Sequence, residues 1–195
     1  MTAPPVRLVL ASASPRRLDL LARIGVTPDK IVPADVDESV PTGELPRDHA
    51  LRLAGEKAEA VAALEPDSLV LAADTVVAVG RRILPKVEDE AVLRDAMKLL
   101  SGRRHRVMTG VALAAPGQAL RTRLVETMIA MKALSDEEID FYAAHGEWRG
   151  KAGGYALQGY GEVYVRHIAG SYSNVVGLPL AQTRNLLKSA GYPIA

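Results

Sequence analysis

A short apolar run that leads directly into a helix start is the feature that most constrains this chain of 195 residues. The run from Val6 to Leu10 is typical of a buried strand. Shortly after it, Ser14 suits a helix N-cap and Pro15 suits the first helical position. Gly25 then marks the expected end of this helix. A strand that passes straight into a helix favours an α/β fold.

Strand and helix patterns alternate along the rest of the chain, without an internal repeat or a low-complexity linker. The order is that of a mixed sheet flanked by helices rather than a regular βαβ repeat. We therefore expect a single α/β domain over residues 1–195. The further strands are expected at 30–34, 68–73, 75–79, 105–115, 120–131 and 161–168, and the further helices at 47–64, 88–100, 135–145 and 178–190.

Composition excludes several classes of protein. Lys and Arg number 24 against 23 Asp and Glu, a balance that argues against broad nucleic-acid binding. No apolar run is long enough to cross a membrane, so no membrane partner is expected. The chain has no Cys, which excludes disulfides and thiolate metal sites and is compatible with a reducing cytoplasm. We expect a cytoplasmic protein.

The first helix start carries groups that suit an anion. Ser12, Ser14, Arg16 and Arg17 surround a helix N-terminus, which presents free N–H groups and a partial positive charge. Hydroxyls and guanidiniums at such a place favour the binding of phosphates. Paired arginines are equally typical of a solvated helix face, so this motif alone leaves both interpretations open.

Acidic residues at two places in the chain are candidates for catalysis or metal binding. Asp35, Asp37 and Glu38 follow an expected strand, where clustered carboxylates suit Mg²⁺ or Mn²⁺, although a polar loop start has the same composition. Asp74 lies between two apolar runs, so it is expected near the core with a partner. This predicts a general base or metal ligand, with a bulge or turn aspartate as the alternative.

Three more polar residues are candidates for substrate contacts. Lys57 lies on an expected helix that also carries Gly55, a costly residue there unless close packing or substrate approach requires it. Lys86 offers a point charge for a phosphate, and Gln158 offers an amide that can recognise a base edge. Each lysine taken alone is also typical of a surface.

These residues occur in an order that resembles the Maf family, the septum-formation-inhibitor-related nucleotide pyrophosphatases. The resemblance extends from Leu8 to Leu187 and no single block decides it, but the joint order is highly specific. The matching blocks are residues 11–17 (ASASPRR), 36–38 (VDE), 53–58 (LAGEKA), 73–77 (ADTVV), 105–111, 151–161 and 174–180 (NVVGLPL).

The resemblance implies hydrolysis of a nucleoside triphosphate to the monophosphate and pyrophosphate, dependence on a divalent cation (Mg²⁺ or Mn²⁺), and commonly a homodimer. It also implies an elongated inosine-triphosphatase-like fold of two lobes with a central cleft. Asp74 matches the family's proton acceptor, and Glu38 and Asp74 would hold the metal. The phosphate- and metal-handling residues fall here on Ser12, Arg17, Glu38, Lys57, Asp74 and Lys86.

Three positions distinguish the base preferences within the family. The branch acting on dTTP and UTP carries Arg, Thr and Gln, which fall on Arg16, Thr75 and Gln158. The 7-methyl-GTP branch carries Trp, Gln and Glu, which suit a cationic purine. The resemblance thus favours pyrimidine triphosphates. A nucleotide-binding regulator of cell division with incidental hydrolysis, or a pyrophosphatase for another base, remains the alternative.

The chain departs from the family around its second lysine. The family has Gly-Lys-Pro or a similar sequence there, whereas this chain has Pro85, Lys86 and Val87. The shifted proline leaves open the path of this loop and hence the reach of Lys86.

Overall fold

A mixed sheet of seven strands forms the centre of the computed structural model, which describes residues 6–194. Its order is β2-β1-β3-β6-β7-β9, with β4 paired to β3, and β5 and β8 form a separate two-stranded ribbon. The α/β prediction is confirmed. The strands are β1 (Leu8–Leu10), β2 (Lys30–Ile31), β3 (Leu69–Val79), β4 (Arg82–Leu84), β5 (Lys86–Val87), β6 (Arg104–Ala114), β7 (Arg121–Met131), β8 (Lys151–Ala152) and β9 (Val165–Ala169).

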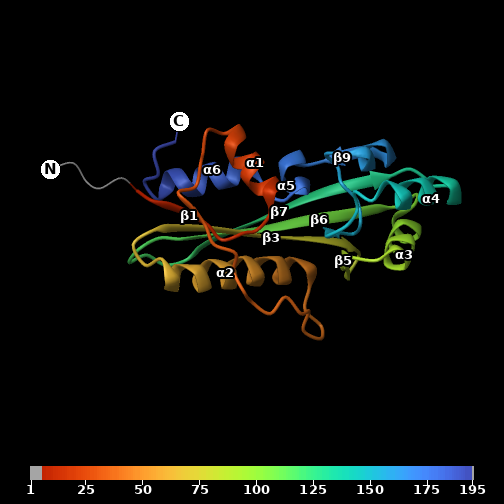
Figure 1. Ribbon diagram of the computed structural model, residues 1–195. Coiled ribbons are helices and arrows are strands. Elements are labelled where there is room, and N and C mark those ends of the chain that lie inside the picture. Colours follow the sequence, from red (N-terminus) through yellow and green to blue (C-terminus); the bar gives the residue numbers. More distant parts are fainter. Residues whose placement is uncertain (1–5, 195) are drawn as a thin grey trace.

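Helices cover both faces of this elongated sheet (Figure 1). The helix α2 lies along one face, α1, α5 and α6 lie on the other, and α3 and α4 gather at one end. None of the described helices has the length and apolar character needed to cross a membrane. The helices are α1 (Pro15–Arg23), α2 (Pro46–Leu64), α3 (Glu90–Leu100), α4 (Asp136–His145), the 3₁₀ helix η1 (Tyr160–Tyr164), α5 (Tyr172–Val176) and α6 (Leu180–Ser189).

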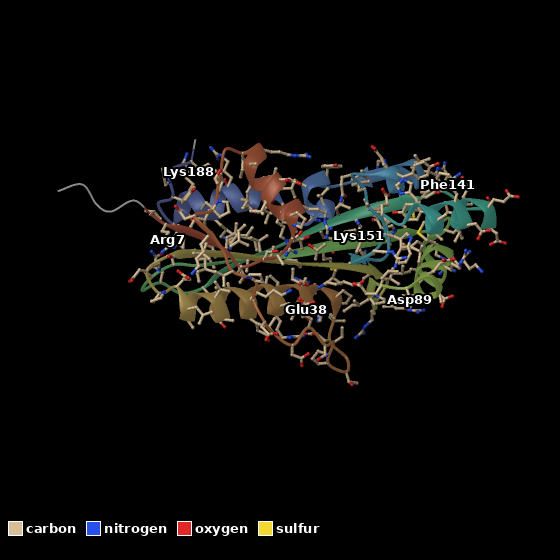
Figure 2. The ribbon with its side chains drawn as sticks, viewed as in Figure 1. Arg7, Glu38, Asp89, Phe141, Lys151 and Lys188 are labelled. Carbon is tan, nitrogen blue, oxygen red and sulfur yellow. The ribbon has the colours of Figure 1, made fainter. Side chains whose placement is uncertain are left out.

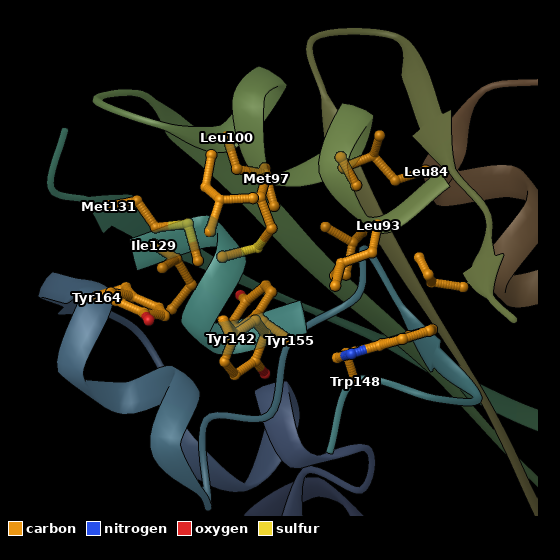
Figure 3. Packing of buried hydrophobic residues seen from close by; sticks show 14 of the residues in the cluster. Leu84, Leu93, Met97, Leu100, Ile129, Met131, Tyr142, Trp148, Tyr155 and Tyr164 are labelled. Carbon is orange, nitrogen blue, oxygen red and sulfur yellow. The ribbon is translucent and has the colours of Figure 1, made fainter. Parts of the chain in front are cut away.

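The long strand β3 passes through the hydrophobic clusters on both sides of its midpoint. Leu71 belongs to a cluster with β1, α1 and α6, whereas Val77 belongs to a cluster with α3 and α4. Figure 3 shows the second cluster, in which Trp148 and Tyr155 pack near Leu93. Successive strand residues point to opposite faces, so even-numbered positions such as Ala72 pack toward α2 instead.

The sheet has a gap beside the middle of β3. The strand β6 pairs with β3 along one edge over residues 70–78. On the other edge β1 pairs only with Leu69–Leu71 and β4 only with Val77–Val79. Within residues 6–194, no strand fills the space between them. Asp74 and Thr75 therefore lie on a buried strand with one open edge.

Close packing brings α2 onto this part of the sheet. A Cβ atom built on Gly110 would lie 2.2 Å from the carbonyl oxygen of Ala50, so a side chain there would push the helix away. The register pairs Gly110 with Asp74. The absence of a side chain at Gly110 thus sets the distance from which Lys57 on α2 reaches the strand.

Four expected strands differ from the structure, and one helix was not expected. Residues 68–73 and 75–79 form one continuous strand, because Asp74 keeps regular register with Gly110 and has a cationic partner; the bulge or turn alternative is wrong. The expected strand at 161–168 begins as η1, since Gly161 packs directly against the backbone of Ala156. The expected strand at 30–34 is reduced to two residues, and α5 was not predicted.

Candidate active site

All nine residues predicted for the site line one cavity of about 450 Å³, which opens at the gap beside β3. Figure 2 shows Glu38 beside α2 and Lys151 near the middle of the sheet, both bordering this region. The structure thus brings together residues from both ends of the chain. The nine are Ser12, Arg16, Arg17, Glu38, Lys57, Asp74, Thr75, Lys86 and Gln158.

A chain of ion pairs runs along one side of the cavity, from the buried strand β3 to the exposed rim. The Nζ atom of Lys57 lies 2.7 Å from Oδ1 of Asp74 and 2.5 Å from Oε1 of Glu38. The Nζ atom of Lys86 lies 2.5 Å from the other oxygen of Glu38. Lys57 and Asp74 are both buried, so each charge depends on the other. Lys86 therefore reaches the site despite the shifted proline beside it.

The Glu38 carboxylate is held in its ionised form. Partial burial by itself would raise its pKa, but hydrogen bonds from Lys57 and Lys86 outweigh burial and lower the pKa to about 2. Glu38 is consequently an anion throughout the physiological pH range. Asp37, by contrast, accepts hydrogen bonds from Ser39 and braces its own loop rather than lining the cavity.

Arg17 holds together the wall of the cavity that lies opposite these ion pairs. Its Nε donates to the carbonyl oxygen of Gly177 at 2.9 Å, and its Nη1 donates to Oγ of Ser12 at 2.9 Å. A longer contact of 3.5 Å joins Nη2 to Oγ1 of Thr75. Burial lowers the pKa of Arg17, and the carboxylate of Asp74 acts in the opposite direction. The guanidinium thus connects α1, β3 and the turn after α5.

A hydroxyl pair continues this network beneath the cavity. Oγ1 of Thr75 lies 3.0 Å from Oγ1 of Thr109, which donates to the carbonyl oxygen of Asn174 at 3.0 Å. The Asn174 amide donates to the carbonyl oxygen of Val107 at 3.0 Å. This explains why the segment around Asn174 is buried: it closes the core next to the site.

The glycine-rich segment forms the rim that carries Gln158. Gly153 and Gly154 have φ angles of +67° and +71°, which favour glycine, and both pack tightly against apolar side chains. Tyr155 follows them, and its hydroxyl lies 2.8 Å from Nε2 of the buried His105. These contacts fix the rim, while Gln158 itself is exposed at the mouth of the cavity.

The side chains that could bind a metal ion here are too few to form a complete site, so a bound ligand would supply the remaining coordinating atoms. Within the described chain, no group of three His, Cys, Asp or Glu side chains is placed to hold an ion. Glu38 and Asp74 are the two carboxylates that line the cavity, and Lys57 bridges them. Mg²⁺ is commonly held by one or two carboxylates together with substrate phosphates, so this pair fits such an ion.

The cavity lining is strongly cationic. Its ionisable side chains are six cations and two carboxylates, which gives a formal charge of 6 − 2 = +4. A nucleoside triphosphate carries a charge of about −4, so the lining matches an anion of this kind. The cations are Arg16, Arg17, Lys57, Lys86, Arg149 and Lys151.

Comparison with known families identifies the family to which the chain belongs. The family model described as "Maf-like protein" matches residues 7–190. The chain belongs to the Maf family. In this Maf protein, each block that carried the resemblance contributes to the lining of one site, and together they surround the open edge of β3.

Close relatives support the same family assignment. A Caulobacter vibrioides protein named dTTP/UTP pyrophosphatase is 62% identical over 98% of this chain and 99% of its own. A Novosphingobium aromaticivorans protein of the same name is 60% identical over 96% of this chain and 93% of its own. Among solved structures, a HAM1 protein from Coxiella burnetii has a TM-score of 0.52 at 14% identity, covering 95% of this chain and 100% of that one. That likeness concerns the fold alone.

Sequence reasoning missed several residues of this Maf site. Arg149, Lys151 and Tyr155 line the cavity; the last two lie in the block 151–161 that carried the resemblance, but no role was assigned to their side chains. Thr109 lies beneath the cavity as the cross-strand neighbour of Thr75. Two signals were present in the sequence: the density of glycines from residue 146 to 161, and cationic residues placed among them.

Proposed function

We propose that the protein hydrolyses dTTP and UTP to the nucleoside monophosphate and pyrophosphate. The observation that carries the proposal is the convergence of Arg16, Thr75 and Gln158 on the same cavity as Asp74 and Lys57. The names of relatives at about 60% identity support the same reaction and the same bases. Free nucleotides as substrates favour a cytoplasmic location.

Asp74 is proposed to orient the attacking water and accept its proton. The water oxygen bonds to the α-phosphorus, the bond between the α-phosphorus and the bridging oxygen to the β-phosphate breaks, and pyrophosphate leaves. The Nζ atom of Lys57 lies 2.7 Å from Oδ1 of Asp74 and fixes the position of that carboxylate. Arg17, Lys57 and Lys86 neutralise the phosphates, and positioning with charge stabilisation carries most phosphoryl chemistry.

Glu38 and Asp74 are proposed to hold a divalent cation, Mg²⁺ or Mn²⁺, together with substrate phosphates. When bound, the cation neutralises phosphate charge and polarises phosphate oxygens. The ionised state of Glu38 supports this role, since its pKa is lowered to about 2 despite partial burial. Ser12 is proposed to contact a phosphate beside the N-terminus of α1, to which it is adjacent.

Base selection is proposed to rest on the rim. A pyrimidine with two carbonyls and one N–H suits an arginine and an amide, which Arg16 and Gln158 present at the cavity. We also propose that the chain is a single domain of two lobes with the cavity between them, and that it forms a homodimer. Sedimentation velocity would test the homodimer.

The deciding experiment measures pyrophosphate release from dTTP, UTP, CTP, ITP and 7-methyl-GTP, with Mg²⁺ or Mn²⁺ present. Preferential release from dTTP and UTP, with the monophosphate as co-product, is the expected result. Preference for another base would overturn the specificity argument. Nucleotide binding without hydrolysis of any of them would favour a regulatory protein instead.

A further inference from the structure

The positive charges of the cavity are not all paired with carboxylates. Both carboxylates lie at one end, where Lys57 and Lys86 are their partners. Lys151 and Arg16 line the same cavity, and within residues 6–194 neither has a carboxylate partner in an ion pair. The structure therefore has a second group of cations that the ion pairs of the protein do not neutralise.

Lys151 is held so that its ammonium retains a free donor. It lies on β8, which pairs with β5, the strand that carries Lys86. Its Nζ donates to the carbonyl oxygens of Glu147 and Arg149. An ammonium has three N–H donors, and these two carbonyls take two of them. The third remains for a group in the cavity.

The positive charges of Arg16 and Lys151 repel each other. Burial lowers the pKa of Lys151 and the nearby positive charge of Arg16 lowers it further, while the carboxylate of Glu147 acts in the opposite direction. Arg16 is partly buried, and within the described chain its side chain makes no hydrogen bond or ion pair. Two cations held together in a cleft are unfavourable unless an anion binds between them. Arg16 has five N–H donors, so it can contact a base carbonyl and an anion at the same time.

We propose that Lys151, with Arg16, forms a phosphate-binding subsite distinct from the carboxylate-bearing end of the cavity. Its ligand is a phosphate oxyanion, which comes either from the pyrophosphate part or from the monophosphate part of the nucleotide. The subsite deepens the proposed function and rests on it for the identity of the ligand. Lys151 is thus a substrate-binding residue rather than only a brace for its loop.

The test compares Lys151→Met with Lys151→Arg and the wild type. Inorganic pyrophosphate and dTMP are titrated separately, without metal, by calorimetry. Lys151→Met is expected to weaken binding of at least one probe about tenfold, whereas Lys151→Arg keeps most of the affinity because the charge remains. The probe that loses affinity identifies which part of the nucleotide the subsite takes. Lys188→Met is the control, since Lys188 is exposed and lies toward one end of the molecule, away from Lys151 (Figure 2).

A purely structural lysine gives a different result. Lys151→Met would then lower the melting temperature, through the lost bonds to the Glu147 and Arg149 carbonyls, and leave both dissociation constants unchanged. That outcome, or no binding of either probe to the wild type, overturns the proposal. If the wild type hydrolyses no nucleotide but binds a probe through Lys151, the proposed function fails and the subsite stands.

A second measurement needs no variant. Amine-selective labelling of the wild type near neutral pH, followed by mass spectrometry, reports the accessibility of individual lysines. Saturating pyrophosphate or dTMP is expected to slow labelling of Lys151 at least about fivefold and to leave Lys188 unaffected. Equal labelling of Lys151 with and without both probes would contradict the subsite.

Discussion

Lys57 on α2 and Asp74 on β3 form a buried ion pair, with Nζ 2.7 Å from Oδ1, at the open edge of the central sheet. A carboxylate in this position would be costly without its partner. The same ammonium contacts Glu38, so one lysine joins the proposed base to the other proposed metal ligand. The pair explains how β3 accommodates an aspartate in a buried position.

Replacing Asp74 with Asn should separate chemistry from binding. We expect kcat for dTTP to fall about 10²–10⁴-fold, because the amide cannot accept a proton from water. The dissociation constant for dTMP should stay within about tenfold, since the cations of the cavity remain. Steady-state kinetics and calorimetry measure the two effects, with Asp95→Asn on the exposed face of α3 as control. Near-normal turnover of Asp74→Asn would disprove the assignment.

Lys86 should control the acidity of Glu38. Removing its charge in Lys86→Met takes away one of the two ammonium groups that lower the Glu38 pKa to about 2. We expect that pKa to rise toward 4.5, its ordinary value, while Lys57 prevents a complete return. Carboxyl-selective NMR titration measures the change, and Lys98→Met serves as control. An unchanged Glu38 titration would show that Lys86 does not contact Glu38 in solution.

Gln158→Glu should alter the nucleotide preference of the enzyme. A carboxylate cannot donate the N–H that the amide offers to a pyrimidine carbonyl. We expect kcat/KM for dTTP and UTP to drop about tenfold or more, corresponding to ~1.4 kcal/mol. The Mn²⁺ concentration needed for half-maximal activity should change little. The same substitution at Gln182 on α6 is the control, and an unaltered nucleotide profile would refute a base-reading role.

His105 should make stability depend on pH. Burial lowers its pKa from 6.5 to about 4, so it stays neutral in the folded protein where the unfolded chain already binds a proton. The unfolded state therefore takes up more protons between these values, and stability falls as pH drops through that window. We expect a loss of about 3 kcal/mol between pH 7 and 4 from this group. Urea unfolding measures it, and His105→Gln should flatten the dependence within this window.

Two glycines that contact neighbouring elements should respond oppositely to alanine. In Gly110→Ala the new Cβ would lie 2.2 Å from the Ala50 carbonyl oxygen, and we expect the free energy of unfolding to fall by about 3 kcal/mol or more. In Gly55→Ala it would lie 3.4 Å from Cδ2 of Leu120, an ordinary contact. Higher helix propensity should then raise the free energy by about 0.5–1 kcal/mol. Chemical denaturation of both variants provides the comparison.

The sequence predicts those parts of the molecule that local patterns determine. The helix expected at 135–145 is present and begins with a capping box of Ser135 and Glu138, and the long strands over 104–114 and 121–131 follow their apolar patterns. The residues of the site were also predicted, since their types and order are specific. Their roles and the two-lobe organisation stay predictions.

Other features depend on contacts between distant segments, which a single sequence does not reveal. In the continuous strand β3, Asp74 pairs with Lys57 from another element, and in the 3₁₀ helix at 160–164, Gly161 packs against the backbone of Ala156. Lys151 gave no periodic signal, because a short ribbon with β5 places it at the cavity. Such effects become visible only when the elements are assembled.

The continuity of β3 also limits how the cleft can change its aperture. A single uninterrupted strand passes through both large hydrophobic clusters and beneath the site, and β6 follows it along almost its whole length. Within the described residues β3 has no break at which its two halves could rotate, in contrast to enzymes that close by rotating two domains about a linker. Adjustment to a substrate falls instead to the rim segments that carry Glu38, Lys86 and Gln158. We expect the backbone of β3 to exchange its amide protons as slowly with nucleotide bound as without it.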